Sequence, residues 1–243
     1  ALGLPGTAAW AQAPTTRVVV GFAPGGSVDA LARLVGDALQ TGLGRTAIVE
    51  NRTGAAGRLA VEQVKAAPPD GSMLLLAPQG PMTLFPHVFR NLRYDPGRDF
   101  VPVTRVASGD FALTIGPMVP AKDMKGFRAW LKTAGDKASY GSPGAGTIPH
   151  FVGVAISRQL GVPMTHVPYR GSALTMNDLA GGQIAAAVSP VTEALELHKA
   201  GRVTIIATSG STRTPFVAGV PTLKELGIAV DVPLWFAVYA PAA

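Results

Sequence analysis

Short apolar runs alternate along this chain with segments in which apolar residues recur every three or four positions. The runs are typical of buried strands, and the spaced pattern is typical of helices with one buried face. The first run is Val18 to Phe22, and the first spaced pattern begins at Ser27 and includes Val28, Leu31, Ala32, Val35 and Leu39. Further strands are predicted at 46–50, 73–77, 101–106, 111–115, 139–141, 165–168, 183–188 and 203–208, and further helices at 57–67, 126–133, 151–160, 173–179 and 192–199.

The order of these elements predicts an α/β protein with two lobes. Strands and helices alternate, which is typical of mainly parallel sheets flanked by helices. A loop-rich segment at 94–102 separates a first such unit from a second. We expect one lobe from residues 17–105 and 220–243, and the other from 106–219. Crossing segments at 99–106 and 208–221 would join the lobes, with a ligand cleft between them at the carboxyl ends of the strands.

Glycine-rich loops connect several predicted strands to the helices that follow. The first is Ala23-Pro24-Gly25-Gly26, and similar junctions recur at 141–147, 169–172 and 188–190. Ser27, Thr147 and Ser172 are expected to cap the helices after three of these loops. The backbone N–H groups at a helix start suit an anion such as a carboxylate or phosphate. A single junction is better explained by a tight turn that needs glycine for its geometry, but the set predicts a composite anion site.

Composition narrows the classes of function. The chain has 243 residues, of which 47% are hydrophobic and 15% charged. This length is enough for one large domain or two modest ones, each with its own core. The net charge of +6 is mild, and no basic run carries interleaved aromatics, which argues against nucleic acid as a partner. The absence of cysteine excludes disulfides, thiol catalysis and thiolate metal sites. No apolar run approaches the roughly 18 residues of a membrane span.

The first residues indicate export. Residues 1–10 are small, apolar and uncharged, and Ala11-Gln12-Ala13 matches the A-x-A pattern of a signal-peptidase site. An alanine-rich leader with a chance match is the alternative. We favour a signal-peptide remnant at residues 1–13 and a mature protein that begins near residues 14–17.

Common catalytic motifs are missing from the chain. It has no P-loop, dinucleotide fingerprint or nucleophile elbow, and its four histidines lack metal-binding spacing, so we expect no metal or cofactor. His150 either faces the cleft or orders its loop, which is the preferred role, and His166 is expected to be buried. Asp29 either complements the helix dipole or bonds a ligand. Arg170 either clamps a carboxylate or is exposed, and Phe22 is either a cleft wall or part of the core.

Motifs along nearly the whole chain match one family. The segment from Val18 to Asp29, with Ala32 and Arg33, resembles the opening of the Bug proteins, the solute receptors of tripartite tricarboxylate transporters. The resemblance continues through 49–57, 69–71, 94–96, 99–103, 140–146, 166–171, 178–182, 219–222, 235 and 240–241. It implies a two-lobed, type II-like periplasmic binding protein that closes on a small carboxylate (a di- or tricarboxylate, an amino acid or an aromatic acid). It also implies a monomer that delivers its ligand to a membrane permease of a Gram-negative bacterium.

The resemblance also implies that backbone groups of both lobes bind the ligand. In the first lobe it points to Phe22, Ala23, Pro24, Gly25, Gly26, Ser27 and Asp29. In the second lobe it points to Ser142, Gly144, Ala145, Gly146, Thr147, His150, Gly171, Ser172 and Ser189, to which Arg170 is added as the one cation placed to clamp a carboxylate. Gln79 and Gly80, after the third strand, are expected to tune selectivity.

Two features depart from the family pattern. Gly21 stands where the family usually has proline. The glycine is expected to loosen the end of the first strand. The family continues past Pro241 into a helical segment that packs on the first lobe, whereas the printed chain stops at Ala243. A lobe without that segment is expected to expose apolar surface.

A solute receptor is the function that these features favour, and two alternatives stay open. One is an enzyme that acts on an anionic substrate, with His150 or Asp29 as its base. The other is a sensor that presents its ligand-bound form to a membrane signalling protein. The paired glycine loops, the export signal and the lack of catalytic motifs favour the receptor.

Overall fold

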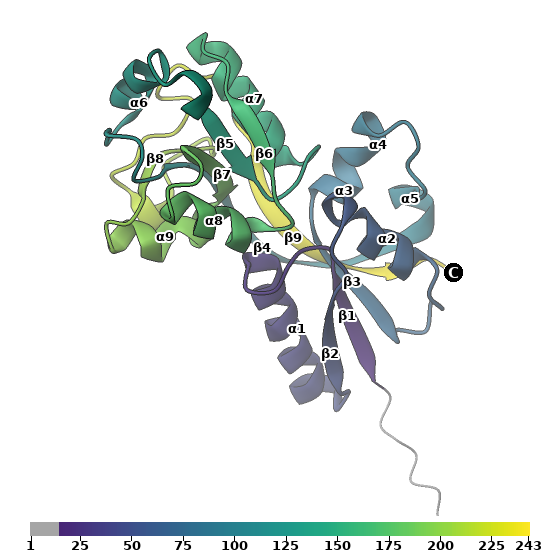
Figure 1. Cartoon of the computed structure of the whole chain (residues 1–243). Coiled ribbons are helices and arrows are strands. Elements are labelled where there is room, and N and C mark those ends of the chain that lie inside the picture. The colour runs from purple at the N-terminus through teal and green to yellow at the C-terminus, as the bar shows by residue number, and fades with distance from the viewer. Residues whose placement is uncertain (1–14) are drawn as a thin grey trace, which may run out of the picture.

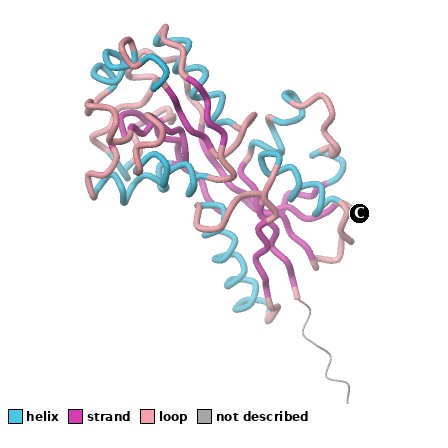
Figure 2. Tube along the Cα trace, viewed as in Figure 1, coloured by secondary structure: helices cyan, strands magenta, loops and turns pink. Residues whose placement is uncertain are grey.

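A computed structural model describes residues 15–243, and the predicted signal-peptide remnant lies outside the described residues. The chain forms two α/β lobes joined by long strands (Figures 1 and 2). The first lobe contains β1 (Thr16–Val20), α1 (Ser27–Leu43), β2 (Ala47–Asn51), a 3-10 turn (Ala55–Gly57), α2 (Arg58–Lys65), β3 (Met73–Pro78), α3 (Gly80–Thr83), α4 (Phe85–Val88) and α5 (Pro96–Asp99). The second lobe contains α6 (Met124–Leu131), a 3-10 turn (Gly135–Lys137), β5 (Ser139–Ser142), α7 (Ile148–Leu160), β6 (Thr165–Pro168), α8 (Ser172–Ala180), β7 (Ala186–Pro190), α9 (Val191–Lys199), β8 (Thr204–Thr208) and a 3-10 turn (Pro215–Val217).

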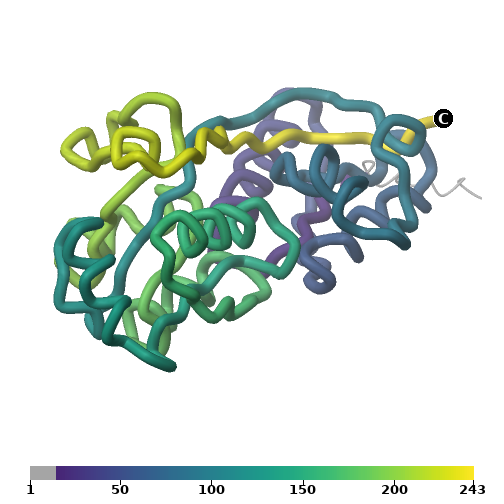
Figure 3. The backbone as a smooth tube through the Cα atoms, turned by 90° about the horizontal axis from the view of Figure 1, so that it is seen from above, coloured from purple at the N-terminus to yellow at the C-terminus, as the bar shows by residue number. Residues whose placement is uncertain are grey.

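The joining strands are β4 (Phe100–Ile115) and β9 (Pro233–Pro241). They pair antiparallel from Phe100 opposite Pro241 to Asp110 opposite Pro233, and Figure 3 shows them side by side along the length of the molecule. The sequence predicted separate strands at 101–106 and 111–115. Residues 107–110 continue the strand because β9 supplies each of them with a partner, whereas the pairing shifts register earlier, between Pro102 and Thr104 and between Arg105 and Ala107.

Each lobe is built on a sheet that combines parallel strands with the joining strands. The first lobe has the order β2-β1-β3-β9-β4, in which β1 is parallel to both of its neighbours and β9 is antiparallel to β3. The second lobe has the order β4-β7-β5-β6, in which β5 is parallel to β6 and β7, and β8 pairs with β4. The alternation of strands and helices therefore predicted the parallel part of each sheet.

The return to the first lobe lies later in the chain than the predicted 208–221 crossing. Thr208 bridges to Thr222, and the amide of Val232 donates to the carbonyl of Ser209. The amide of Ala229 donates to Oε1 of Gln159 in α7 at 2.7 Å. Residues 209–232 thus pack on the second lobe, and β9 is the segment that returns.

Both faces of each sheet are covered by helices. In the first lobe, Val18 faces the α1 side and Val19 faces the α2 side, where it joins Val61 and Val64 in one buried cluster. This alternation follows from the two-residue period of a strand. In the second lobe, buried clusters with α6 and α7 on one face and with α8 and α9 on the other play the same role. The strands end at the interface between the lobes, so the loops that follow them meet there.

Candidate functional site

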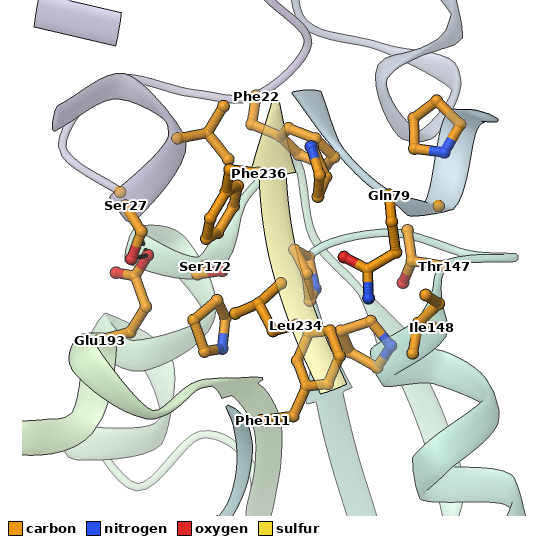
Figure 4. A pocket seen from close by; sticks show the side chains of 18 of the residues that line it. Phe22, Ser27, Gln79, Phe111, Thr147, Ile148, Ser172, Glu193, Leu234 and Phe236 are labelled. Carbon is orange, nitrogen blue, oxygen red and sulfur yellow. Dashed lines mark hydrogen bonds between the residues drawn. The ribbon is translucent and has the colours of Figure 1, made fainter. Parts of the chain in front are cut away.

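A pocket lies between the two lobes at the ends of their strands (Figure 4). Its cavity volume is about 50 Å³ in this arrangement of the lobes. Its walls are mainly aromatic rings, aliphatic side chains and prolines, namely Phe22, Val28, Pro78, Pro81, Phe85, Phe111, Pro143, Ile148, Pro149, Pro190, Leu234 and Phe236. An apolar pocket with a few polar groups is the usual form of a small-molecule site.

The loop after β1 is held by Asp29. Its carboxylate accepts hydrogen bonds from the Gly25 amide at 3.1 Å, from Nδ2 of Asn51 at 2.9 Å, and from the Arg33 guanidinium at 3.0 and 3.2 Å. Burial alone would raise the pKa of Asp29, but these hydrogen bonds outweigh it and lower the pKa below its usual value. The carboxylate is therefore occupied within the first lobe, and Asp29 does not line the pocket.

Phe22 is positioned by a close approach of two glycines. A Cβ atom at Gly21 would lie 2.5 Å from Cα of Gly57, and a Cβ at Gly57 would lie 3.3 Å from the ring of Phe22. Gly57 also has a φ of 90°, in the left-handed region that favours glycine. The glycine at position 21, which departs from the family pattern, therefore makes room for the backbone that supports this pocket wall.

The loop after β5 is held by hydrogen bonds among its own polar groups. Thr147 accepts from the His150 amide at 3.5 Å and caps α7 as predicted, and its hydroxyl donates to the Gly144 carbonyl at 2.7 Å. The Gly146 amide donates to Nδ1 of His150 at 3.1 Å. His150 thus orders the loop, the role preferred from the sequence. The hydroxyl oxygen of Ser142 lies 2.7 Å from Nε2 of His166, within hydrogen-bond distance.

His150 and His166 stack with their ring centroids 4.0 Å apart. Burial lowers the pKa of His150. Burial, with a smaller contribution from His150, lowers the pKa of His166 to about 4. Folding therefore favours the neutral form of this pair.

We expect acid to destabilise the protein through His166. Its folded pKa of about 4 is below the ordinary value of 6.5, so the unfolded chain binds the proton more readily. The contribution to the free energy of unfolding is complete above pH 6.5 and is lost as the pH falls toward 4. The side chain is partly exposed, so we expect a loss of only about 1 kcal/mol. Urea denaturation at a series of pH values measures it.

Two substitutions check the source of this pH dependence. H166Q, which cannot titrate, is expected to flatten the dependence over that pH range. H87Q changes an exposed histidine of α4 and is expected to keep the wild-type dependence. A dependence that is equally steep in H166Q would assign it to other groups.

Two helix starts differ from the predicted capping. The N-caps of α1 and α8 are Gly26 and Gly171, without a side-chain hydrogen bond, so Ser27 and Ser172 are the first residues inside their helices. Ser27 is instead bonded by Glu193 of α9, whose Oε1 lies 2.6 Å from the Ser27 amide and 2.7 Å from its hydroxyl. A carboxylate from the second lobe therefore caps α1 in the first lobe.

Further contacts hold the lobes close together beside the pocket. The Ala23 amide donates to the Arg170 carbonyl at 2.9 Å. A Cβ atom at Gly144 would lie 3.1 Å from Cβ of Ala56, and a Cβ at Gly146 would lie 2.6 Å from the ring of Phe89. The loop after β5 can thus approach the first lobe closely because Gly144 and Gly146 have no side chains.

Gln79 ties the first lobe to β9. Its Nε2 donates to the Pro233 carbonyl at 2.6 Å, and its Oε1 accepts from the Trp235 amide at 3.0 Å. The side chain lines the pocket, but its amide is already bonded to the backbone.

The pocket brings together part of the predicted site. Eight of the predicted residues line it, namely Phe22, Ala23, Gly26, Ser27, Gln79, Gly80, Thr147 and Ser172. The others do not line it, namely Pro24, Gly25, Asp29, Ser142, Gly144, Ala145, Gly146, His150, Arg170, Gly171 and Ser189. Most of these belong to the loops that carry the lining residues, whereas the side chain of Arg170 is exposed.

Glu193, Phe111, Leu234 and Phe236 line the pocket and were not predicted. The run of strand-forming residues at 233–240 is a local signal for β9, and it would have placed two of them near the joining strands. Glu193 has no such signal, because an acidic residue in the first turn of a helix is explained by the helix dipole.

Among residues 15–243 no group of histidine and acidic side chains has the arrangement of a metal site. Within the same part of the chain, no helix is long and apolar enough to cross a membrane.

Known proteins resemble this chain in architecture and in sequence. A UPF0065 protein of Cupriavidus necator is 32% identical over 246 residues, covering 99% of this chain and 74% of that protein. MatC from Rhodopseudomonas palustris, solved with bound malate, superposes with a TM-score of 0.87 at 31% identity, covering 93% of this chain and 78% of that chain. A second R. palustris protein, solved with adipate, superposes with a TM-score of 0.89 at 28% identity. The match covers 97% of this chain and 79% of that chain.

A family model described as the tripartite tricarboxylate transporter family receptor matches residues 31–243. The match includes the starts of α7 and α8, the joining strands and most of the pocket. The two-lobed fold and the resemblance drawn from the sequence motifs are confirmed. The chain belongs to the receptor family of the tripartite tricarboxylate transporters.

Proposed function

We propose that this protein is a periplasmic receptor that binds a small carboxylate in the pocket between its lobes and delivers it to a membrane permease. The observation that carries the proposal is the convergence of the starts of α7 and α8 on one pocket, through Thr147 and Ser172, beside the start of α1, whose Ser27 amide is bonded to Glu193. The first amides of a helix lack an acceptor within the helix and favour an anion. The relatives solved with malate and adipate support a carboxylate.

Ligand binding is proposed to shift the protein toward the closed arrangement of the lobes. β4 and β9 are the joining segments, so bending there moves one lobe against the other. The first lobe brings Phe22, Ala23 and Ser27 to the ligand, and the second brings Thr147 and Ser172. The remaining predicted residues act by holding these loops in place. We further propose that the protein is exported and works as a monomer.

The surroundings of the two candidate bases, His150 and Asp29, favour binding without turnover over catalysis. His150 receives a hydrogen bond from the Gly146 amide on its Nδ1, and Asp29 is bonded by three groups of its own lobe. Neither lines the pocket. A general base must reach the proton that it removes, directly or through one water molecule.

Native mass spectrometry of the purified protein, followed by a thermal-shift screen of mono-, di- and aromatic carboxylates, tests the proposal. A ligand at a hundred times its Kd is expected to stabilise the fold by about 2.7 kcal/mol. For a chain of this size that raises Tm by roughly 5–10 °C. A screen in which no carboxylate raises Tm, or a bound acid that is released chemically altered, would contradict the receptor.

A charge placed at the start of α7 provides a direct test of the pocket. Ile148 is the first residue of this helix and lines the pocket, so I148D puts a carboxylate beside the amides that would bind the ligand. We expect it to weaken binding about a hundredfold, because like charges repel in a partly buried site. S211D adds the same charge at an exposed loop of the second lobe and is expected to bind as wild type does.

A further inference from the structure

The polar groups of the pocket lie at two ends, with apolar walls between them (Figure 4). Ser27, Ser172 and Glu193 lie at one end, which we name the acidic end. Gln79 and Thr147 lie at the other, which we name the amide end. The rings of Phe22, Phe111 and Phe236 and the side chain of Leu234 lie between the ends.

At the acidic end, a carboxylate of the protein itself occupies the start of α1. Oε1 of Glu193 accepts from both the amide and the hydroxyl of Ser27, at 2.6 and 2.7 Å. A Cβ atom at Gly26 would lie 3.2 Å from the same oxygen, so the glycine N-cap leaves room for it. These contacts join residues 166 positions apart in the chain and connect the two lobes.

No cation of the pocket balances this carboxylate. Among the residues that line the pocket, Glu193 is the only one with an ionisable side chain. Arg33 of α1 is paired with Asp29 at 3.0 Å, outside the pocket lining. Burial raises the pKa of Glu193 above its usual value, and the two hydrogen bonds from Ser27 oppose this rise by stabilising the ionised form. A second anionic group brought to the acidic end therefore meets a like charge in a setting that screens it poorly.

The amide end offers a different environment to an anion. Thr147 and Ile148 bring the start of α7 to the pocket, and no acidic side chain lines that end. The amide of Gln79 is bonded to β9, Pro149 has no N–H, and the His150 amide donates to Thr147, which leaves the Ile148 amide as the backbone donor from the start of α7. A ligand carboxylate at the amide end would place the body of the ligand along the aromatic walls.

We propose that Glu193 makes this receptor selective for ligands with a single carboxylate and an apolar body. This selectivity rests on the receptor function proposed above. The ligand carboxylate binds at the amide end, and the far end of the ligand reaches Glu193. An uncharged group is accepted there, an ammonium group is favoured, and a second carboxylate is rejected. The malate and adipate of the related structures carry two carboxylates, so this chain differs in selectivity from those relatives.

Two series of acids, matched in shape, test this selectivity by isothermal titration calorimetry. The first is hexanoate, 6-aminohexanoate and adipate, and the second is benzoate, 4-(aminomethyl)benzoate and terephthalate. In wild type we expect each diacid to bind about tenfold more weakly than its monoacid, and each amino acid to bind at least as tightly. In E193Q, which keeps the size of the side chain, the difference between diacid and monoacid is expected to fall to about twofold or less.

E196Q is the matched control, because Glu196 lies one turn further along α9, is exposed and pairs with Lys199. It is expected to keep the wild-type order. Diacids that bind wild type as tightly as their monoacids, or an order that E193Q leaves unchanged in a folded protein, would overturn the selectivity and leave the receptor standing. If no acid of either series binds any of these proteins, the selectivity fails, and the receptor function is decided separately by the wider carboxylate screen.

Discussion

G153A is expected to lower the free energy of unfolding by about 3 kcal/mol, although it adds a single methyl group. The new Cβ atom would lie 2.0 Å from Cε2 of Tyr140 and 2.5 Å from two other ring atoms. Tyr140 is fully buried, its hydroxyl donates to the His150 carbonyl at 2.9 Å, and its ring packs on His166. The ring cannot retreat without losing that hydrogen bond, so α7 must shift away from β5.

Urea denaturation measures this loss, and a second glycine in a helix provides the control. Gly42 lies in α1 with open space around the position of a Cβ atom. G42A is therefore expected to stabilise the protein by about 0.5 kcal/mol, because alanine favours the helix. In a Y140L background the methyl group at position 153 has room, and its cost is expected to fall by more than half. A G153A protein as stable as wild type would show that α7 and β5 are less tightly packed than described.

The sequence predicted those parts of the fold whose signals are local. The valine run of β1, the glycine loop after it and the helical spacing of α1 lie within 30 residues and were identified together. The N-cap at Thr147 was equally local. Each of these features depends on the backbone preferences of neighbouring residues, which a single sequence carries.

The features that depend on contacts between distant segments could not be predicted in the same way. Ser27 has the sequence of an N-cap, yet it lies inside α1 because Glu193, distant in sequence, supplies the capping oxygen. The Ser108-Gly109-Asp110 segment has the composition of a turn, but it continues β4 because β9 pairs with it. Local propensity was overridden in both places by a partner that only the folded chain provides.

The pocket residues divide along the same line. The loops were found from their glycines, and Phe22, Gly26 and Thr147 line the pocket. The apolar walls contributed by Phe111 and Phe236 were missed, since an aromatic residue in a strand is ordinary core until its neighbours are known. The sequence left Arg170 open between a carboxylate clamp and an exposed residue. Its side chain is exposed, and its carbonyl accepts from the Ala23 amide of the other lobe.

G144V is expected to hold the lobes apart and to weaken ligand binding about a hundredfold, while both lobes remain folded. A Cβ atom at Gly144 would lie 3.1 Å from Cβ of Ala56 and 3.3 Å from its Cα, which belong to the opposite lobe. Valine adds further methyl groups to a contact that is already tight, and the loop around Ala56 has little freedom, because its φ of 58° is in the left-handed region. Separation of the lobes relieves the clash with Ala56, whereas Cγ2 of Thr147, in the same loop and 3.2 Å from the added Cβ, must shift slightly to make room.

Small-angle X-ray scattering and calorimetry separate this effect from a loss of folding. We expect a larger radius of gyration for G144V in the presence of ligand, weak binding, and a free energy of unfolding within about 1 kcal/mol of wild type. G219V, at an exposed position with open space around it, should close and bind normally. Closure favours binding only if ligand contacts from both lobes form at once, so a G144V protein that stays open and yet binds tightly would place the ligand on one lobe alone.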